Sequence, residues 1–172
     1  MVCLTAIVAI MVAFPGRLPG QTAAVKSSGG SSGPTQWSVQ VGKVDPGNLD
    51  LAYSFQIAIY EELMNELNKT KQFQQVLRDG DHKAREVPNL LVLKTTVEKY
   101  TPGSETQRAV TTVSGATKLT VRSQLVTRGG EVVLERNVNG DVRFFGSNLR
   151  ATHNLARNIA NTIKQSSWSG SE

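Results

Sequence analysis

The chain has 172 residues, with 19 basic side chains, 14 acidic ones and a net charge of +5 at pH 7. With 39% hydrophobic residues it is long enough for one domain with a substantial core. The only cysteine, Cys3, stands at the start of the first apolar run and not after it, which excludes the lipid-bearing cysteine of a lipoprotein leader. A mature chain without Cys3 has no disulfide, no cysteine nucleophile and no thiolate-bound metal.

The first apolar segment, residues 2–14, predicts a signal peptide. It ends at Pro15 and is shorter than the about 20 residues that a membrane-spanning helix needs. Thr22 and Ala24 are small residues at cleavage-site spacing, so we expect a signal peptide at 1–24 and an exported protein, periplasmic or extracellular. An uncleaved leader that anchors the protein in the membrane is the alternative. The remaining organisation predicted is a Gly/Ser-rich flexible linker at 25–36, one domain at 37–166 and a disordered tail at 167–172.

Hydrophobic periodicity predicts strands and one long helix in the first half of the domain. Residues 37–44 alternate as a half-buried strand does, and Asn48, after a Pro-Gly turn, can cap the next helix. Residues 51–69 are amphipathic, and Tyr53 and Tyr60 are expected to fill the core from the apolar side. The elements predicted next are a short strand at 73–78, a charged connection at 79–88, a strand at 90–100, a loop at 101–107, and a loop or strand at 109–116.

The runs 117–126 and 131–138 alternate and predict a hairpin closed at the glycine pair 129–130. A two-residue loop would place Arg136 on the apolar side of the hairpin, which indicates either a longer loop or a position near the edge of the sheet.

A second amphipathic helix is predicted at 148–165, with Ser147 or Asn148 as its cap. Two one-sided helices and strands with one polar face predict an α+β domain. The expected architecture is a mixed, mainly antiparallel sheet of four to five strands with two helices packed on one face.

Candidate catalytic residues are few. Asp79, Asp81 and His82 approach a metal or acid–base cluster, but the basic residues that follow favour a solvated turn. His153 lies on the flank of the last helix, where a surface position is the expected role. Because the chain has neither a G-x-S-x-G elbow nor a Gly-rich nucleotide loop, we expect no enzyme, cofactor or metal site. A small periplasmic hydrolase with a histidine-based site is the alternative.

The solvent side of the hairpin is the candidate partner-binding face. It would present Lys118, Arg122 and Gln124 in a row, with Asn137 opposite Arg122 and Glu135 opposite Gln124. A polar sheet face is most often only exposed to water, but basic residues outnumber acidic ones in this part of the chain. The expected partner is an envelope protein or an anionic envelope component. Nucleic acid is not expected, because no exposed aromatic residues are interleaved with the basic ones.

From Ala58 onward the chain resembles the bacterial domain of unknown function 4410 family. The matching residues are Phe73 with Val76, Gly103-Ser104 with Arg108, residues 115–121, Gly130-Glu131-Val132, and Gly146-Ser147 leading into Ala156, Ile159, Ala160 and Ile163. Where that family usually has an acidic turn, this chain has Thr127-Arg128-Gly129. The resemblance implies an exported protein or lipoprotein and assigns no functional residues. The sequence therefore predicts a non-catalytic binding or assembly module of the bacterial cell envelope.

Overall fold

The computed structural model describes residues 36–104, 106, 116–142 and 148–166. Its elements are β1 (Ser38–Asp45), α1 (Tyr53–Thr70), β2 (Val76–Arg78), the 3-10 helix η1 (His82–Arg85), β3 (Leu90–Thr101), β4 (Lys118–Thr127), β5 (Val132–Asn139) and α3 (Arg150–Gln165). This order confirms the predicted α+β class. The expected leader, the linker as far as residue 35, residues 109–115 and the tail lie outside the described residues.

The five strands form one sheet in the order β2-β1-β3-β4-β5. β1 runs parallel to both of its neighbours, β2 and β3. The β3–β4 and β4–β5 pairs are antiparallel and have the longer ladders. The sheet is therefore mixed and mainly antiparallel, as predicted. Its two edges are the short β2 at one end and β5 at the other.

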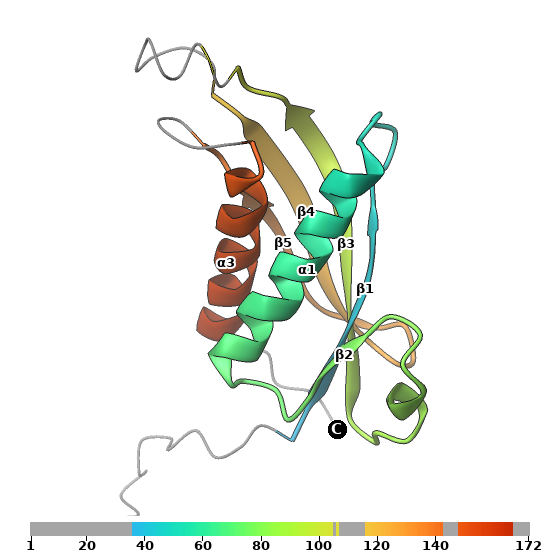
Figure 1. Cartoon of the computed structure of the whole chain (residues 1–172). Coiled ribbons are helices and arrows are strands. Elements are labelled where there is room, and N and C mark those ends of the chain that lie inside the picture. Colours follow the sequence, from blue (N-terminus) through green and yellow to red (C-terminus); the bar gives the residue numbers. More distant parts are fainter. Residues whose placement is uncertain (1–35, 105, 107–115, 143–147, 167–172) are drawn as a thin grey trace, which may run out of the picture. The chain divides into compact units, whose positions relative to one another are not determined.

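Both helices cover the same face of this sheet, where they lie side by side (Figure 1). Alternate strand residues such as Val39, Leu93 and Val121 point into the core, and all three are 0% exposed. They meet Ile59 and Leu63 of α1, which are also fully buried. The opposite face of the sheet has no α-helix on it in the part of the chain described, and its side chains at Lys118 and Arg122 are exposed.

The first helix begins later than predicted, and one of the two tyrosines expected in the core lies outside it. α1 starts at Tyr53 with Ala52 as its N-cap, so Asn48 does not cap it. Tyr53 is 75% exposed, and the expectation that it fills the core was wrong. Phe55 takes that place, with its ring centroid 4.9 Å from that of Tyr100 on β3. Burial raises the pKa of the Tyr100 phenol.

The hairpin pairs as predicted along most of its length, but its loop has three residues. Thr127 N–H donates to the carbonyl of Glu131 at 2.8 Å, and Gly130 N–H donates to the carbonyl of Thr127 at 3.0 Å. Gly130 has φ +92°, whereas Gly129 is not in the positive region, so the loop is no primed two-residue turn. A register shift between Leu125 and Val126 absorbs the extra residue. Arg136 is exposed on the edge strand β5. Both the longer loop and the position near the edge of the sheet were predicted as explanations for this residue.

The last helix, α3, begins at Arg150 and has Leu149 as its N-cap, with no side-chain cap. Asn148, an expected cap, instead accepts a hydrogen bond from the hydroxyl of Thr117 at 2.7 Å and donates to the carbonyl of Gly103 at 3.3 Å. The other expected cap, Ser147, lies outside the described residues. The predicted apolar stripe is buried except for Leu149, which is 55% exposed.

The charged connection between β2 and β3 folds onto the open face of the sheet. Ala84 of η1 is buried with Leu77 and Leu90 in a small apolar cluster of its own, and Val87 packs against it. This cluster holds η1 beside one end of β3. The open face is therefore bounded at that end by residues 79–88.

Candidate functional site

The structure places all five residues of the predicted partner-binding face on the open side of the sheet. Along β4, Lys118, Arg122 and Gln124 alternate with the buried core residues, and Lys118 and Arg122 are exposed. Asn137 and Glu135 of β5 lie opposite Arg122 and Gln124, in the predicted register. The positions of these residues are thus as expected.

Two contacts order this face. The Gln124 side-chain amide donates to the carboxylate of Glu135 at 2.6 Å. Arg122 Nε lies 3.6 Å from the carboxylate of Glu98 on β3, in a solvent-exposed ion pair. Lys118 forms no ion pair with any residue that the structure describes. On β4, the charge of Lys118 is therefore available to a partner, whereas the charge of Arg122 is partly neutralised by Glu98.

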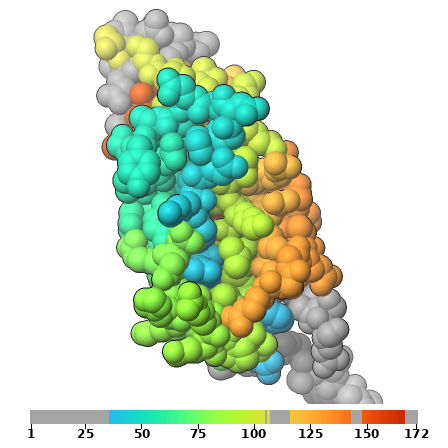
Figure 2. Space-filling model, turned by 90° about the vertical axis from the view of Figure 1, so that its right-hand side faces the viewer, coloured from blue at the N-terminus to red at the C-terminus, as the bar shows by residue number. Residues whose placement is uncertain are grey.

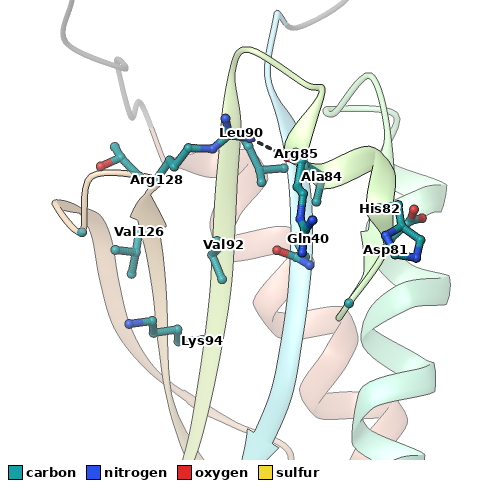
Figure 3. Close-up of a pocket in the computed structure, with 13 residues that line it drawn as sticks. Gln40, Asp81, His82, Ala84, Arg85, Leu90, Val92, Lys94, Val126 and Arg128 are labelled. Carbon is teal, nitrogen blue, oxygen red and sulfur yellow. Dashed lines mark hydrogen bonds between the residues drawn. The ribbon is translucent and has the colours of Figure 1, made fainter.

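A hollow of about 630 Å³ opens on the same face, between η1 and the β4–β5 turn (Figure 3). Its floor is formed by Gln40, Val92 and Val126 from three adjacent strands. Lys94 lines the hollow as well, and it pairs with Gln124 across β3 and β4, so the hollow and the predicted face are continuous. Sequence reasoning missed this hollow, because η1 reaches the sheet only through tertiary contacts.

Basic side chains dominate the walls of the hollow. Arg85 comes from η1, Lys94 from β3 and Arg128 from the β4–β5 turn (Figure 3). The Arg128 guanidinium donates to the main-chain carbonyls of Ala84 and of Val87, the latter at 3.1 Å, and so ties η1 to the hairpin. Arg85 and Lys94 form no ion pair with another described residue, so their charge is available to an anion.

The acidic turn before η1 has a structural role. Asp81 accepts a hydrogen bond from the main-chain N–H of Lys83 at 3.0 Å and caps η1. The Asp79 carboxylate lies 3.9 Å from the ammonium of Lys43. These contacts agree with the solvated turn that the sequence favours.

The two histidines lie on different elements and on opposite faces of the sheet. His82 lines the hollow on the open face, while His153 is on α3. His153 Nδ1 lies 3.0 Å from a carboxylate oxygen of Glu62, across the two helices. The hydrolase alternative requires a cleft that gathers one of these histidines with a carboxylate. His153 has such a partner in Glu62, but neither of these two residues lines the hollow.

A second, smaller hollow of about 420 Å³ lies beside α1 at the edge of the sheet. Tyr53, Ile57 and Tyr60 line it from the helix, and Lys43 lines it from β1. Figure 2 shows this side of the molecule, where β1 (blue) reaches the surface beside α1. The exposed Tyr53 side chain thus forms part of this second hollow, which is a surface groove lined by two tyrosines.

An ion pair closes one end of this groove. The Arg78 guanidinium donates to both carboxylate oxygens of Glu61, at 2.6 and 2.8 Å, and its carbon lies 5.7 Å from the centre of the Tyr60 ring. These hydrogen bonds hold the pKa of Glu61 below its ordinary value of 4.5 and raise the pKa of Arg78. The pair joins α1 to the edge strand β2.

The lowered pKa of Glu61 predicts a pH-dependent contribution to stability. Because the folded-state pKa lies below the unfolded one, the contribution is present above pH 4.5 and is lost as the pH falls through the lowered value. Glu61→Gln should therefore unfold more easily than the wild type at neutral pH, and this difference should shrink below pH 4.5, as urea titrations would measure. Asp50→Asn, at an exposed position without a described ion pair, is the control and should show no such convergence. An equal gap for Glu61→Gln at both pH values would contradict the prediction.

Among the described residues, neither helix combines the length and the apolar character that a membrane crossing requires.

The fold is similar to that of PelC from Paraburkholderia phytofirmans. A PelC dodecamer structure is 15% identical to this chain with a TM-score of 0.54, and the match covers 77% of this chain and 92% of that one. A dodecamer of a PelC variant is 14% identical with a TM-score of 0.54, covering 73% and 85% of the two chains. At these identities the similarity shows the fold alone.

No protein family model and no curated protein matches the chain. The resemblance to the domain of unknown function 4410 family therefore stays a prediction.

Proposed function

We propose that this protein is an exported, non-catalytic binding or assembly module of the cell envelope, and that it holds an anionic envelope component on the open face of its sheet. The observation that carries the proposal is the uncovered sheet face with Arg85 and Lys94 beside the hollow, both without an ion pair among the described residues. Uncompensated cations around a concave surface raise the local concentration of anions.

The chemistry of the hollow favours binding over turnover. Its floor includes Val92 and Val126, and basic side chains outnumber the one carboxylate in its lining, that of Asp81. Such a surface can orient carboxylate, phosphate or sulfate groups through charge-assisted hydrogen bonds. A nucleophile held by a base is the arrangement that covalent catalysis requires, and no such pair is seen among the described residues that line this hollow.

Export and assembly have separate support. The apolar leader and the small residues at Thr22 and Ala24 support export to the periplasm or beyond. The PelC structures with the same fold are dodecamers, which supports assembly as part of the proposed role.

Charge reversal on the open face tests the proposal. Two double variants are made in the full chain, Arg85→Glu with Lys94→Glu and Lys118→Glu with Arg122→Glu. We expect each to capture at least about tenfold less crosslinked partner from intact cells than the wild type does, a change of roughly 1.4 kcal/mol in binding. Capture by the wild type should also weaken at about 1 M salt, where the screening length is only about 3 Å.

The matched control is Arg157→Glu with Lys164→Glu, which makes the same charge change at exposed positions of α3, on the helix side. This variant should keep its partner, and all three should unfold at similar urea concentrations. Equal loss in the control would mean that total charge, not the open face, governs capture. Full retention in both open-face variants would refute the proposed surface.

A further inference from the structure

Three potential metal ligands meet where α1 and α3 pack against each other. Glu62 and Glu66 are one helical turn apart on α1, and His153 faces them from α3. His153 Nδ1 lies 3.0 Å from Oε2 of Glu62 and 3.9 Å from Oε1 of Glu66. One ligand atom from each residue lies within 4.8 Å of the other two, and in the part of the chain that is described only these residues form such a group.

The spacing suits a small divalent ion. Zinc is bound by histidine nitrogen and carboxylate oxygen at about 2.0 to 2.2 Å, which in a tetrahedral site separates neighbouring ligand atoms by about 3.3 Å. The distances of 3.0 and 3.9 Å from His153 Nδ1 bracket this value. Small side-chain rotations would therefore place all three atoms around one ion, with water as the fourth ligand.

The surroundings favour a cation between the helices. The Glu66 side chain is only 10% exposed, while Glu62 and His153 are 33% and 43% exposed. Two carboxylates one turn apart on a helix repel each other, and a divalent ion replaces this repulsion with attraction. The only cation that now contacts them from their own helix is the Lys69 ammonium, 2.6 Å from Oε1 of Glu66. Lys69 is 64% exposed, so it can move into solvent when an ion binds.

We propose that Glu62, Glu66 and His153 form a binding site for a divalent transition-metal ion of the zinc type, which links α1 to α3. Imidazole and carboxylate together suit zinc better than magnesium or calcium, which prefer ligand sets made only of oxygen. The bound ion replaces the hydrogen bond between His153 and Glu62. Because both ligand helices cover the same sheet face, the ion stabilises the packed helix layer. This site is separate from the open face and does not depend on the proposed function.

Zinc chloride titrated into the chelator-treated full chain tests the proposal by calorimetry and by thermal unfolding. All proteins carry Cys3→Ser, so that no thiolate contributes. We expect one zinc ion per chain and a higher unfolding temperature with zinc than without it. His153→Ala and Glu62→Gln should each weaken zinc binding at least about tenfold, because even the loss of a residue that only orients a metal ligand typically costs about 10- to 100-fold in affinity. His82→Ala removes the other histidine of the chain and is the matched control, which should bind zinc as the parent does.

Lys69→Ala adds an independent readout. Removing the ammonium that competes for Glu66 should tighten zinc binding, whereas zinc bound elsewhere on the chain would show unchanged affinity and would contradict the proposal. Unfolding without zinc identifies any variant that fails to fold. If His153→Ala fails to fold, Glu62→Gln, which keeps the size of the side chain, tests the site in its place. Absence of zinc binding in the parent, equal loss in His82→Ala, or unchanged affinity in both ligand variants would overturn the proposal.

Discussion

Leu63→Ala should lower the free energy of unfolding by about 2 to 5 kcal/mol, the range seen when a buried leucine is truncated. Leu63 is 0% exposed on the face of α1 that packs against the sheet, next to Ile59 and Leu67, which are equally buried. The substitution removes buried hydrocarbon and leaves a cavity that the surrounding helix and strands fill only in part. Urea unfolding followed by circular dichroism measures the loss.

Ile57→Ala is the matched control on the same helix. Ile57 is 43% exposed, so its truncation removes little buried surface and should cost less than about 1 kcal/mol. A cost below about 0.5 kcal/mol for Leu63→Ala would mean that α1 turns another face to the core. Equal losses of unfolding free energy for Leu63→Ala and Ile57→Ala would also contradict the assignment of the buried side of α1.

Gly140→Ala should destabilise the protein by about 3 kcal/mol or more, at the upper end of the range for overpacked cores. A Cβ at Gly140 would lie 2.4 Å from the carbonyl oxygen of Ala151, 2.4 Å from the Cβ of Leu155 and 2.8 Å from its Cα. Two of these atoms belong to the backbone of α3, so the clash cannot be relieved by a side-chain rotation. The backbone at Gly140 cannot shift away from α3 without loss either, because its N–H donates a hydrogen bond to the carbonyl of Leu119 at 2.8 Å.

Gly129→Ala is the corresponding control. A Cβ there would meet only the hydroxyl of Thr127, at 3.7 Å, which is an ordinary contact distance. Its φ is not positive, so alanine should change stability by no more than about 0.5 kcal/mol. Thermal unfolding of the two variants side by side separates the close approach of α3 from a general effect of replacing glycine. A mild effect at Gly140 would show that α3 can shift away from β5 at low cost.

The periodicity of apolar residues was sufficient to predict the register of the β4–β5 hairpin and the buried side of α3. Alternation along β4 and β5 predicted a pairing that buries Leu125 opposite Leu134 and Val121 opposite Val138, and the structure has it. In α1 the pattern placed Ile59, Leu63 and Leu67 in the core, where they are, but it also predicted a buried side chain at the first helical position. Contact of Phe55 with Tyr100, far along the chain, decided which aromatic side chain is buried and turned Tyr53 outward.

The hollow on the open face and the pair of Glu62 with His153 both depend on contacts between distant segments, which explains why the sequence did not reveal them. Glu62 and His153 are separated by 91 positions, and no motif links them. Sequence alone indicated a basic polar face on the hairpin, since alternation marks which side chains point away from a core. It could not place η1 over that face, because the cluster of Leu77, Ala84 and Leu90 forms only in the folded chain.

The sequence by itself determined the α+β class, the order of the elements and the polar side of the hairpin, because each follows from periodicity along a continuous segment. Only the tertiary structure decided which aromatic side chain of α1 is buried, where the hollow opens and which carboxylates His153 meets. Those features arise when helices and strands that are remote in the chain pack against one another. The physical reason is that hydrophobic burial constrains a whole face, whereas the position of a single polar side chain depends on the neighbours that packing brings to it.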